Sequence, residues 1–136
     1  MTGFDTNVLI YACDKSDLAR RTKAFNLVSA TTDGILLWQV ACEFIAASRK
    51  LMVQGFTPTD AWARLSEFLD VFPLVLPGPS VLERARGLHL DQGWSFWDAM
   101  VVSAAKEAGA TRLYSEDLPG GSVEGLEIIN PFGPSA

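Results

Sequence analysis

The chain has 136 residues, 49% of them hydrophobic and 20% charged, which is typical of a single globular domain with a hydrophobic core, here residues 1–136. It contains no apolar stretch of about 18 to 20 residues and no signal-peptide pattern at its start, so we expect a cytoplasmic protein with no membrane segment. Its formal net charge of −5 excludes a broad attraction to nucleic acid, so any binding site for a polyanion must be local.

The first half of the sequence alternates between short apolar runs and helical patterns. In order, we predict a strand at residues 2–5, a short helix at 6–12, a helix at 16–31, a strand at 35–37 and a helix at 40–53. Asp5 therefore lies where the first strand gives way to a helix. Glu43 is the single acid of the last of these helices, and apolar residues surround it.

The second half continues the same alternation. We predict a helix from Pro58 to about residue 72, a strand at 74–76, a helix at 80–90 capped by Ser80, a helix that begins at 94 and is closed by Gly109, strands at 112–115 and 126–129, and a rigid, extended tail at 130–134. Asp117 comes directly after one of these strands, in a turn-rich loop at 116–121.

The helix that begins at residue 94 is apolar nearly all the way round, which predicts that it is buried, and it carries Asp98 near its start. Ser95 is a candidate N-cap, which would place Asp98 in the first helical turn, where the helix dipole tolerates negative charge. An unpaired buried carboxylate otherwise needs a cation, a base or a proton. Both interpretations of Asp98 remain open at this point.

Strands separated by helices at this spacing predict right-handed crossovers, and therefore an α/β fold with three layers, α/β/α, and a mostly parallel central sheet. Ligands of such sheets bind beyond the carboxyl ends of the strands, where Asp5 and Asp117 lie. Glu43 and Asp98 lie early in helices that follow a strand or a loop. We therefore expect all four carboxylates to face one crevice.

Four carboxylates in one crevice repel one another unless they bind protons or a cation. Oxygen ligands without His or Cys favour magnesium or manganese over zinc. The single histidine, His89, is interpreted as a surface residue, and Cys13 and Cys42 as core thiols. Because magnesium on carboxylates most often serves phosphate chemistry, hydrolysis of a phosphodiester fits this pattern.

Five segments together resemble the PIN-domain nucleases, and among them the small VapC-type toxins of toxin–antitoxin pairs. The segments are residues 4–10, Glu43 in its apolar helix, residues 97–99, residues 115–118 and residues 130–132. Their order and spacing over nearly the whole chain make the resemblance specific. It implies an endoribonuclease that uses Mg²⁺ or Mn²⁺ and whose catalytic, metal-binding acids are Asp5, Glu43, Asp98 and Asp117.

The resemblance also implies supporting roles for Ser115 and for Thr6 or Asn7 beside the metal. Asp117 is preferred to the adjacent Glu116, because the family's acid lies two residues after a Ser or Thr. Glu116 would then face the opposite way on an extended segment.

The same resemblance implies a protein antitoxin and a homodimer as partners of the chain. Independently of it, Trp62 and Phe68 belong to an amphipathic helix with more apolar surface than a small sheet covers, which favours an interface. We expect an arginine of the antitoxin to enter the acidic crevice. Basic residues such as Arg20 and Arg21 are the available contacts to phosphate, but each is interpreted first as a solvated helix residue. The four tryptophans could stack on bases, but they are interpreted first as core or interface residues.

Two alternatives remain from the sequence. A PIN-like module that keeps the acids only as caps and turn residues would bind a partner without cleaving RNA. A haloacid-dehalogenase-type phosphatase also begins with an Asp at a strand end, but it needs a second Asp two residues later, where this chain has Asn7.

Overall fold

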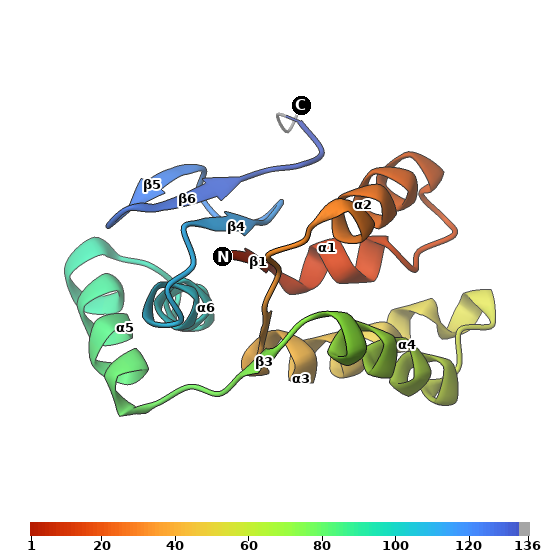
Figure 1. The fold of residues 1–136 in the computed structure, drawn as a ribbon, viewed down its shortest axis with the longest axis horizontal. Helices are drawn as coiled ribbons and strands as arrows, with labels where there is room; N and C mark the ends of the chain where they lie inside the picture. The colour runs from red at the N-terminus through yellow and green to blue at the C-terminus, as the bar shows by residue number, and fades with distance from the viewer. Residues whose placement is uncertain (134–136) are drawn as a thin grey trace.

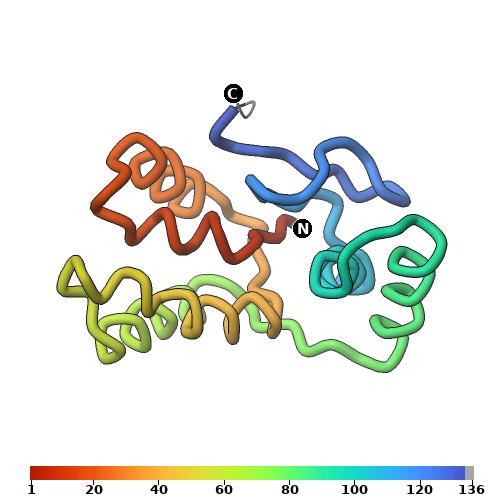
Figure 2. Tube along the Cα trace, turned by 180° about the vertical axis from the view of Figure 1, so that it is seen from behind, coloured from red at the N-terminus to blue at the C-terminus, as the bar shows by residue number. Residues whose placement is uncertain are grey.

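A computed structural model describes residues 1–133 and confirms the α/β fold (Figure 1). In chain order its elements are β1 (Thr2–Phe4), α1 (Thr6–Tyr11), α2 (Leu18–Ala30), β2 (Leu36–Leu37), α3 (Trp38–Ala47), the 3-10 helix η1 (Ser48–Gln54), α4 (Pro58–Val71), β3 (Leu74–Val75), α5 (Pro79–Gln92), α6 (Phe96–Glu107), β4 (Arg112–Tyr114), β5 (Gly121–Val123) and β6 (Leu126–Ile129). Helices α5 and α6 pack together on one side of the strands, and α1 to α4 lie on the other side (Figures 1 and 2).

The central sheet has the strand order β1-β4-β6-β5. Strands β1, β4 and β6 are parallel, and β5 pairs with β6 in the antiparallel direction. The parallel pair β2 and β3 extends this sheet through a single bridge between Thr2 and Gly34. Because Phe4 pairs with Tyr114, β1 and β4 end side by side, and the residues that follow them meet at one edge.

Aromatic and aliphatic side chains from both sides of the sheet form the core. Phe4, Phe44 and Leu113 are at most 1% exposed. A glycine is required at position 34, where the pair β2 and β3 joins the four-stranded sheet, because a Cβ atom there would overlap the ring of Phe72. Each helix of residues 1–133 is too short or too polar to span a lipid bilayer.

Several predicted helix boundaries need correction. Helix α2 begins at Leu18 rather than at residue 16, because the side chain of Asp17 accepts a hydrogen bond from Arg20 N and caps the helix. Helix α5 begins at Pro79 after Gly78, so Ser80 is not its cap. The predicted helix at 40–53 is two elements: α3 follows β2 without a loop, and the chain then tightens into η1.

Strand β5 was not predicted at all. It is short and largely exposed, so it lacks the apolar alternation that identifies a strand in sequence. A tight turn at Glu124 and Gly125, both with positive φ, returns the chain into β6. Of the tail predicted at 130–134, the last residue lies outside the described part of the chain.

Several side chains predicted to be buried are exposed instead. Trp97 at the start of α6 is 62% exposed, so that helix is not buried all the way round. Cys42 is exposed, whereas Cys13 is buried as expected. Trp38 and Trp62 are also exposed, which excludes a core role for these two residues.

Candidate functional site

Asp5 lies directly after β1 and caps α1. One of its carboxylate oxygens accepts a hydrogen bond from the backbone N–H of Thr6 at 2.8 Å, and the other accepts one from the hydroxyl of Ser115 at 2.7 Å. Its backbone N–H donates to the carbonyl of Tyr114, so the end of β1 is bound to the end of β4. The strand register therefore places Asp5 beside the loop that follows β4.

Ser115 organises that loop. Its side chain is 1% exposed, and besides donating to Asp5 its oxygen accepts hydrogen bonds from the backbone N–H groups of Asp117 and Leu118, both at 3.2 Å. The hydroxyl thus turns the chain back on itself after β4. As a result Asp117 stays at the same sheet edge as Asp5.

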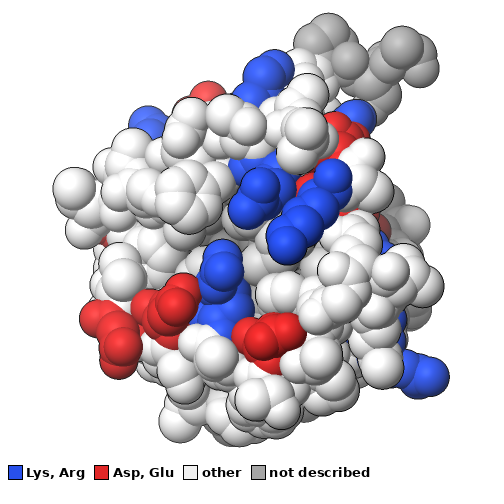
Figure 3. Space-filling view, turned by 90° about the vertical axis from the view of Figure 1, so that its right-hand side faces the viewer, with Lys and Arg blue, Asp and Glu red and all other residues white. Residues whose placement is uncertain are grey.

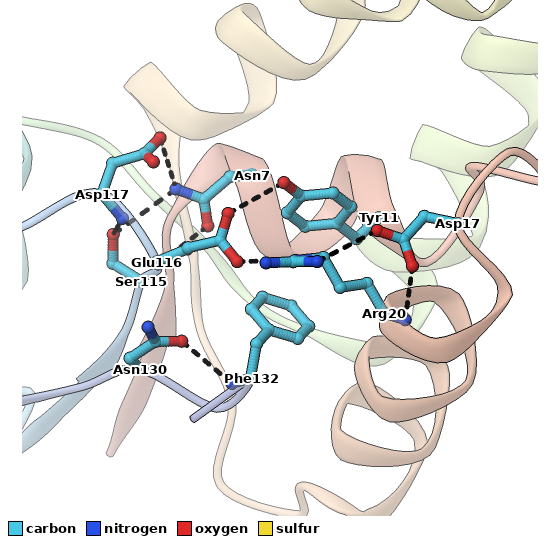
Figure 4. Close-up of polar contacts among 9 residues, drawn as sticks. All are labelled: Asn7, Tyr11, Asp17, Arg20, Ser115, Glu116, Asp117, Asn130 and Phe132. Atoms are coloured by element: carbon cyan, nitrogen blue, oxygen red, sulfur yellow. Dashed lines mark hydrogen bonds and ion pairs between the residues drawn. The ribbon is translucent and has the colours of Figure 1, made fainter. Parts of the chain in front are cut away.

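Asn7 connects α1 to this loop (Figure 4). Its Nδ2 group donates to Asp117 Oδ2 at 3.0 Å and to Ser115 Oγ at 3.5 Å, and its Oδ1 atom accepts from the backbone N–H of Glu116 at 3.2 Å. The amide therefore contacts three consecutive residues of the loop. Because the carboxylate of Asp117 is otherwise exposed, Asn7 determines which way it points.

Glu43 approaches the same edge from α3. Its Oε1 atom accepts hydrogen bonds from the hydroxyl of Thr6 at 3.4 Å and from the side-chain amide of Gln39 at 3.1 Å. The same amide of Gln39 also donates to the carbonyl of Trp97 at 3.2 Å. Gln39, which the sequence did not single out, therefore joins Glu43 to the start of α6.

Asp98 is the least connected of the four acids. Ser95 caps α6 and accepts a hydrogen bond from the backbone N–H of Asp98 at 3.4 Å, which agrees with the first-turn interpretation. Among the described residues, the side chain of Asp98 is partly buried and makes no hydrogen bond with the other three acids. Its link to them runs through Gln39 and the backbone of Trp97.

The charges at this edge are not compensated. Burial is the main cause that raises the pKa of Asp5 above its usual 3.8; the hydrogen bonds from Ser115 and Thr6 lower it, and the nearby charges of Glu43 and Asp117 raise it further. Within residues 1–133, none of the ion pairs includes Asp5, Glu43, Asp98 or Asp117.

This set of oxygen donors, uncompensated and partly buried, fits the chemistry of a hard divalent cation. In the described part of the chain, no three His, Cys, Asp or Glu side chains lie close enough together to form a metal site in the conformation seen. The hydrogen bonds of Ser115, Asn7 and Thr6 hold three carboxylates at one sheet edge: Asp5 directly after β1, Glu43 on α3 and Asp117 in the loop after β4.

Glu116 points away from these acids. Its carboxylate accepts a hydrogen bond from the hydroxyl of Tyr11 at 2.8 Å and from Arg20 Nε at 2.7 Å (Figure 4). Burial, followed by the hydrogen bond to Glu116, raises the pKa of Tyr11 to about 12, so its hydroxyl stays protonated. Arg20 is therefore an ion-pair residue rather than only a solvated helix residue, and no local pattern in the sequence reveals a partner 96 positions away.

An apolar pocket of about 590 Å³ adjoins Glu43. It lies between α3, the connection from β3 to α5, and α6. The exposed rings of Trp38 and Trp97 contribute to its wall, and Glu43 provides a carboxylate at its surface. The pocket therefore combines apolar walls with negative charge.

Comparison with solved structures finds the same fold in proteins of low sequence identity. A toxin–antitoxin complex from Klebsiella pneumoniae contains a chain with a TM-score of 0.66 and 17% identity, over 96% of this chain and 98% of that one. VapC20 from Mycobacterium tuberculosis, described as a sarcin-ricin loop cleaving toxin, has a TM-score of 0.68 and 19% identity, over 86% of this chain and 90% of that one. VapBC2 from Rickettsia felis, bound to a DNA fragment from its promoter, has a TM-score of 0.61 and 16% identity, over 85% of this chain and 86% of that one.

Comparison with curated protein sequences gives no match. The family model of the PIN domain, in contrast, matches residues 4–118. This range includes Asp5, Glu43, Asp98 and Asp117, and with them Ser115 and Asn7. The chain therefore belongs to the PIN domain family.

Proposed function

We propose that the protein is a metal-dependent endoribonuclease and the toxin of a toxin–antitoxin pair. The observation that carries this proposal is the uncompensated group of carboxylates that Ser115, Asn7 and Thr6 hold at one edge of a PIN-domain sheet. The similar structures support it, because one is described as a sarcin-ricin loop cleaving toxin and another as a toxin–antitoxin complex.

The proposed site is formed by Asp5, Glu43, Asp98 and Asp117, which would hold Mg²⁺ or Mn²⁺. When bound, such an ion supplies charge neutralisation of phosphate oxygens and a lower pKa of water. The chain's own residues orient the acids: Ser115 holds Asp5, and Asn7 holds Asp117. Since outer groups of this kind keep ligands in one orientation, they determine how well a metal is bound.

The proposed RNA substrate needs a local positive surface, because the whole chain is acidic. On the face where α1, α2, η1 and α4 meet, Lys and Arg side chains gather around a hollow (Figure 3). A cavity of about 320 Å³ on this face is lined by Lys15, Arg21 and Arg64, together with two acids, Asp60 and Glu67. These basic groups support contacts to the phosphates of RNA.

The proposed antitoxin would occupy the apolar pocket beside Glu43, with an arginine directed at the carboxylates. A homodimer remains part of the proposal. Of the two residues that suggested it, Phe68 is 7% exposed and belongs to the core, whereas Trp62 is 59% exposed. Leu69 and Val71, also on α4, are exposed as well and support an apolar contact surface.

The test of the proposed activity is cleavage of structured RNA by the purified protein with Mg²⁺, with Mn²⁺, with Ca²⁺ and with a chelator. We expect cleavage only with Mg²⁺ or Mn²⁺, and a loss of at least about 100-fold in Asp5→Asn and Asp117→Asn, because each removes a charge that the metal requires. Asp70→Asn, an exposed acid on α4, is the matched control and should cleave normally.

Equal activity of all three variants would refute the site. Tight RNA binding by the wild type without cleavage under any metal would instead identify a binding module.

A further inference from the structure

Arg20 is held by four groups. It lies in the first turn of α2, where its Nη1 atom donates to Asp17 at 3.1 Å while Nε donates to Glu116 at 2.7 Å. Its guanidinium carbon lies 5.4 Å from the centre of the Tyr11 ring and 5.8 Å from that of Phe132 (Figure 4). Two carboxylates and two aromatic rings thus fix a side chain that is 42% exposed.

Because of this arrangement, the carboxylate of Glu116 is held in one orientation. The side chain of Glu116 is only 15% exposed, and its two oxygens are used by Arg20 and by the hydroxyl of Tyr11. A carboxylate this well buried needs a cation, and Arg20 is the cation it has. Without Arg20, no cation would offset the negative charge of Glu116. The carboxylate would then turn towards water, or remain as an added like charge that repels the neighbouring Asp117.

The backbone of Glu116 transmits this orientation to the acids. Its N–H donates to Asn7 Oδ1 at 3.2 Å. This contact fixes the orientation of the Asn7 side-chain amide, because its oxygen must face the N–H of Glu116. The amide nitrogen Nδ2 therefore points towards Asp117 Oδ2, at 3.0 Å. Arg20, Glu116, Asn7 and Asp117 form a continuous chain of contacts from α2 to the sheet edge.

We propose that Arg20 is a positioning residue for the acidic site: it holds Glu116 against α1 and α2, and thereby orients Asn7 and Asp117 and keeps a fifth carboxylate out of the group. The inference rests on the proposed function, since it assigns Arg20 a role in metal binding. It goes beyond that function because, within residues 1–133, the hydrogen bonds of Arg20 reach none of the four proposed ligands.

The test compares Arg20→Gln and Arg20→Lys with Lys23→Gln, which removes an exposed charge from the same helix. The dissociation constant for Mn²⁺ is measured by calorimetry on the full chain. We expect Arg20→Gln to weaken Mn²⁺ binding about 10-fold or more, Arg20→Lys to weaken it less, and Lys23→Gln to leave it within about twofold of the wild type. In a Glu116→Gln background, Arg20→Gln should have a much smaller effect, because both act through the same contact.

A second measurement follows the side-chain amide of Asn7 by NMR in the metal-free protein. Its signals should shift and its hydrogens exchange faster in Arg20→Gln, but not in Lys23→Gln. Unchanged Asn7 signals, or equal Mn²⁺ affinities of folded Arg20→Gln and wild type, would overturn the inference. If Arg20→Gln does not fold, Arg20→Lys and Phe132→Leu replace it in both measurements, and unchanged values in these two variants would overturn the inference equally.

The two readouts also separate this inference from the proposed function. Absence of Mn²⁺ binding by the wild type would refute the metal site. The NMR comparison would still decide whether Arg20 orients Asn7.

Discussion

At the scale of single residues, the acidic site depends on one buried hydroxyl. Ser115 Oγ donates to Asp5 and accepts from two backbone N–H groups of its own loop. A second serine, Ser103 in α6, is equally buried, but its hydroxyl has no hydrogen-bond partner within residues 1–133. The two serines are therefore equally buried, but only the hydroxyl of Ser115 makes hydrogen bonds within residues 1–133.

This contrast gives a stability prediction. Ser115→Ala should lower the free energy of unfolding by about 1 to 3 kcal/mol, because buried polar groups lose their partner. Ser103→Ala should be neutral or stabilising by about 0.5 kcal/mol, since alanine favours a helix and no hydrogen bond is lost. Urea denaturation of the metal-free proteins measures both values. Equal destabilisation by the two substitutions would mean that the Ser115 hydrogen bonds contribute nothing.

At the scale of elements, the sequence predicts those strands and helices that have a recognisable local pattern of apolar and polar residues. The alternation of strands and helices indicates the parallel sheet, and the structure places Asp5 and Ser115 where the paired strands β1 and β4 end. Strand β5 is not predicted, because its side chains are largely exposed and it pairs with β6 through its backbone.

The contact between Arg20 and Glu116 is not predicted either, because the two residues lie 96 positions apart in the sequence. The burial of α6 was overestimated because an apolar sequence does not reveal which face the neighbouring elements leave open.

The junction between the four-stranded sheet and the pair β2 and β3 gives a prediction at this scale. Gly34→Ala should destabilise the fold by about 1 to 3 kcal/mol, because the added methyl group meets the buried ring of Phe72. At Gly87, inside α5, an added Cβ would meet no described atom within 4 Å beyond the neighbouring backbone of its own helix. Gly87→Ala should therefore stabilise the protein by up to about 1 kcal/mol. Thermal melting distinguishes the two, and a neutral Gly34→Ala would show that Phe72 moves aside at little cost.

At the scale of the whole molecule, negative charge is balanced differently at two places. The four proposed ligands take part in no ion pair within residues 1–133, whereas the cavity lined by Lys15, Arg21 and Arg64 also contains the acids Asp60 and Glu67. Repulsion among the acids destabilises the metal-free fold, whereas binding of a cation to the folded state alone stabilises it. The loss of one carboxylate should therefore raise the stability of the metal-free protein and reduce the further stability gained on binding a metal.

Asp5→Asn tests this opposition. Because burial and the charges of Glu43 and Asp117 raise the pKa of Asp5 in the folded state, its contribution to stability is full below pH 3.8 and is lost as the pH rises through the folded-state value. At pH 7 without metal, Asp5→Asn should therefore melt at a higher temperature than the wild type, and the difference should shrink in acid.

Magnesium should reverse this order. At about 100 times the dissociation constant it adds roughly 2.7 kcal/mol to the wild type, which corresponds to a rise in Tm on the order of 10 °C, and Asp5→Asn should lose most of that gain. The same melting curves for Asp98→Asn decide between the two interpretations of that residue: a lost magnesium shift identifies a metal ligand, and an unchanged shift identifies a first-turn helix residue. Equal shifts in all three proteins would exclude both acids as ligands, and no shift in any of them would refute the metal site itself.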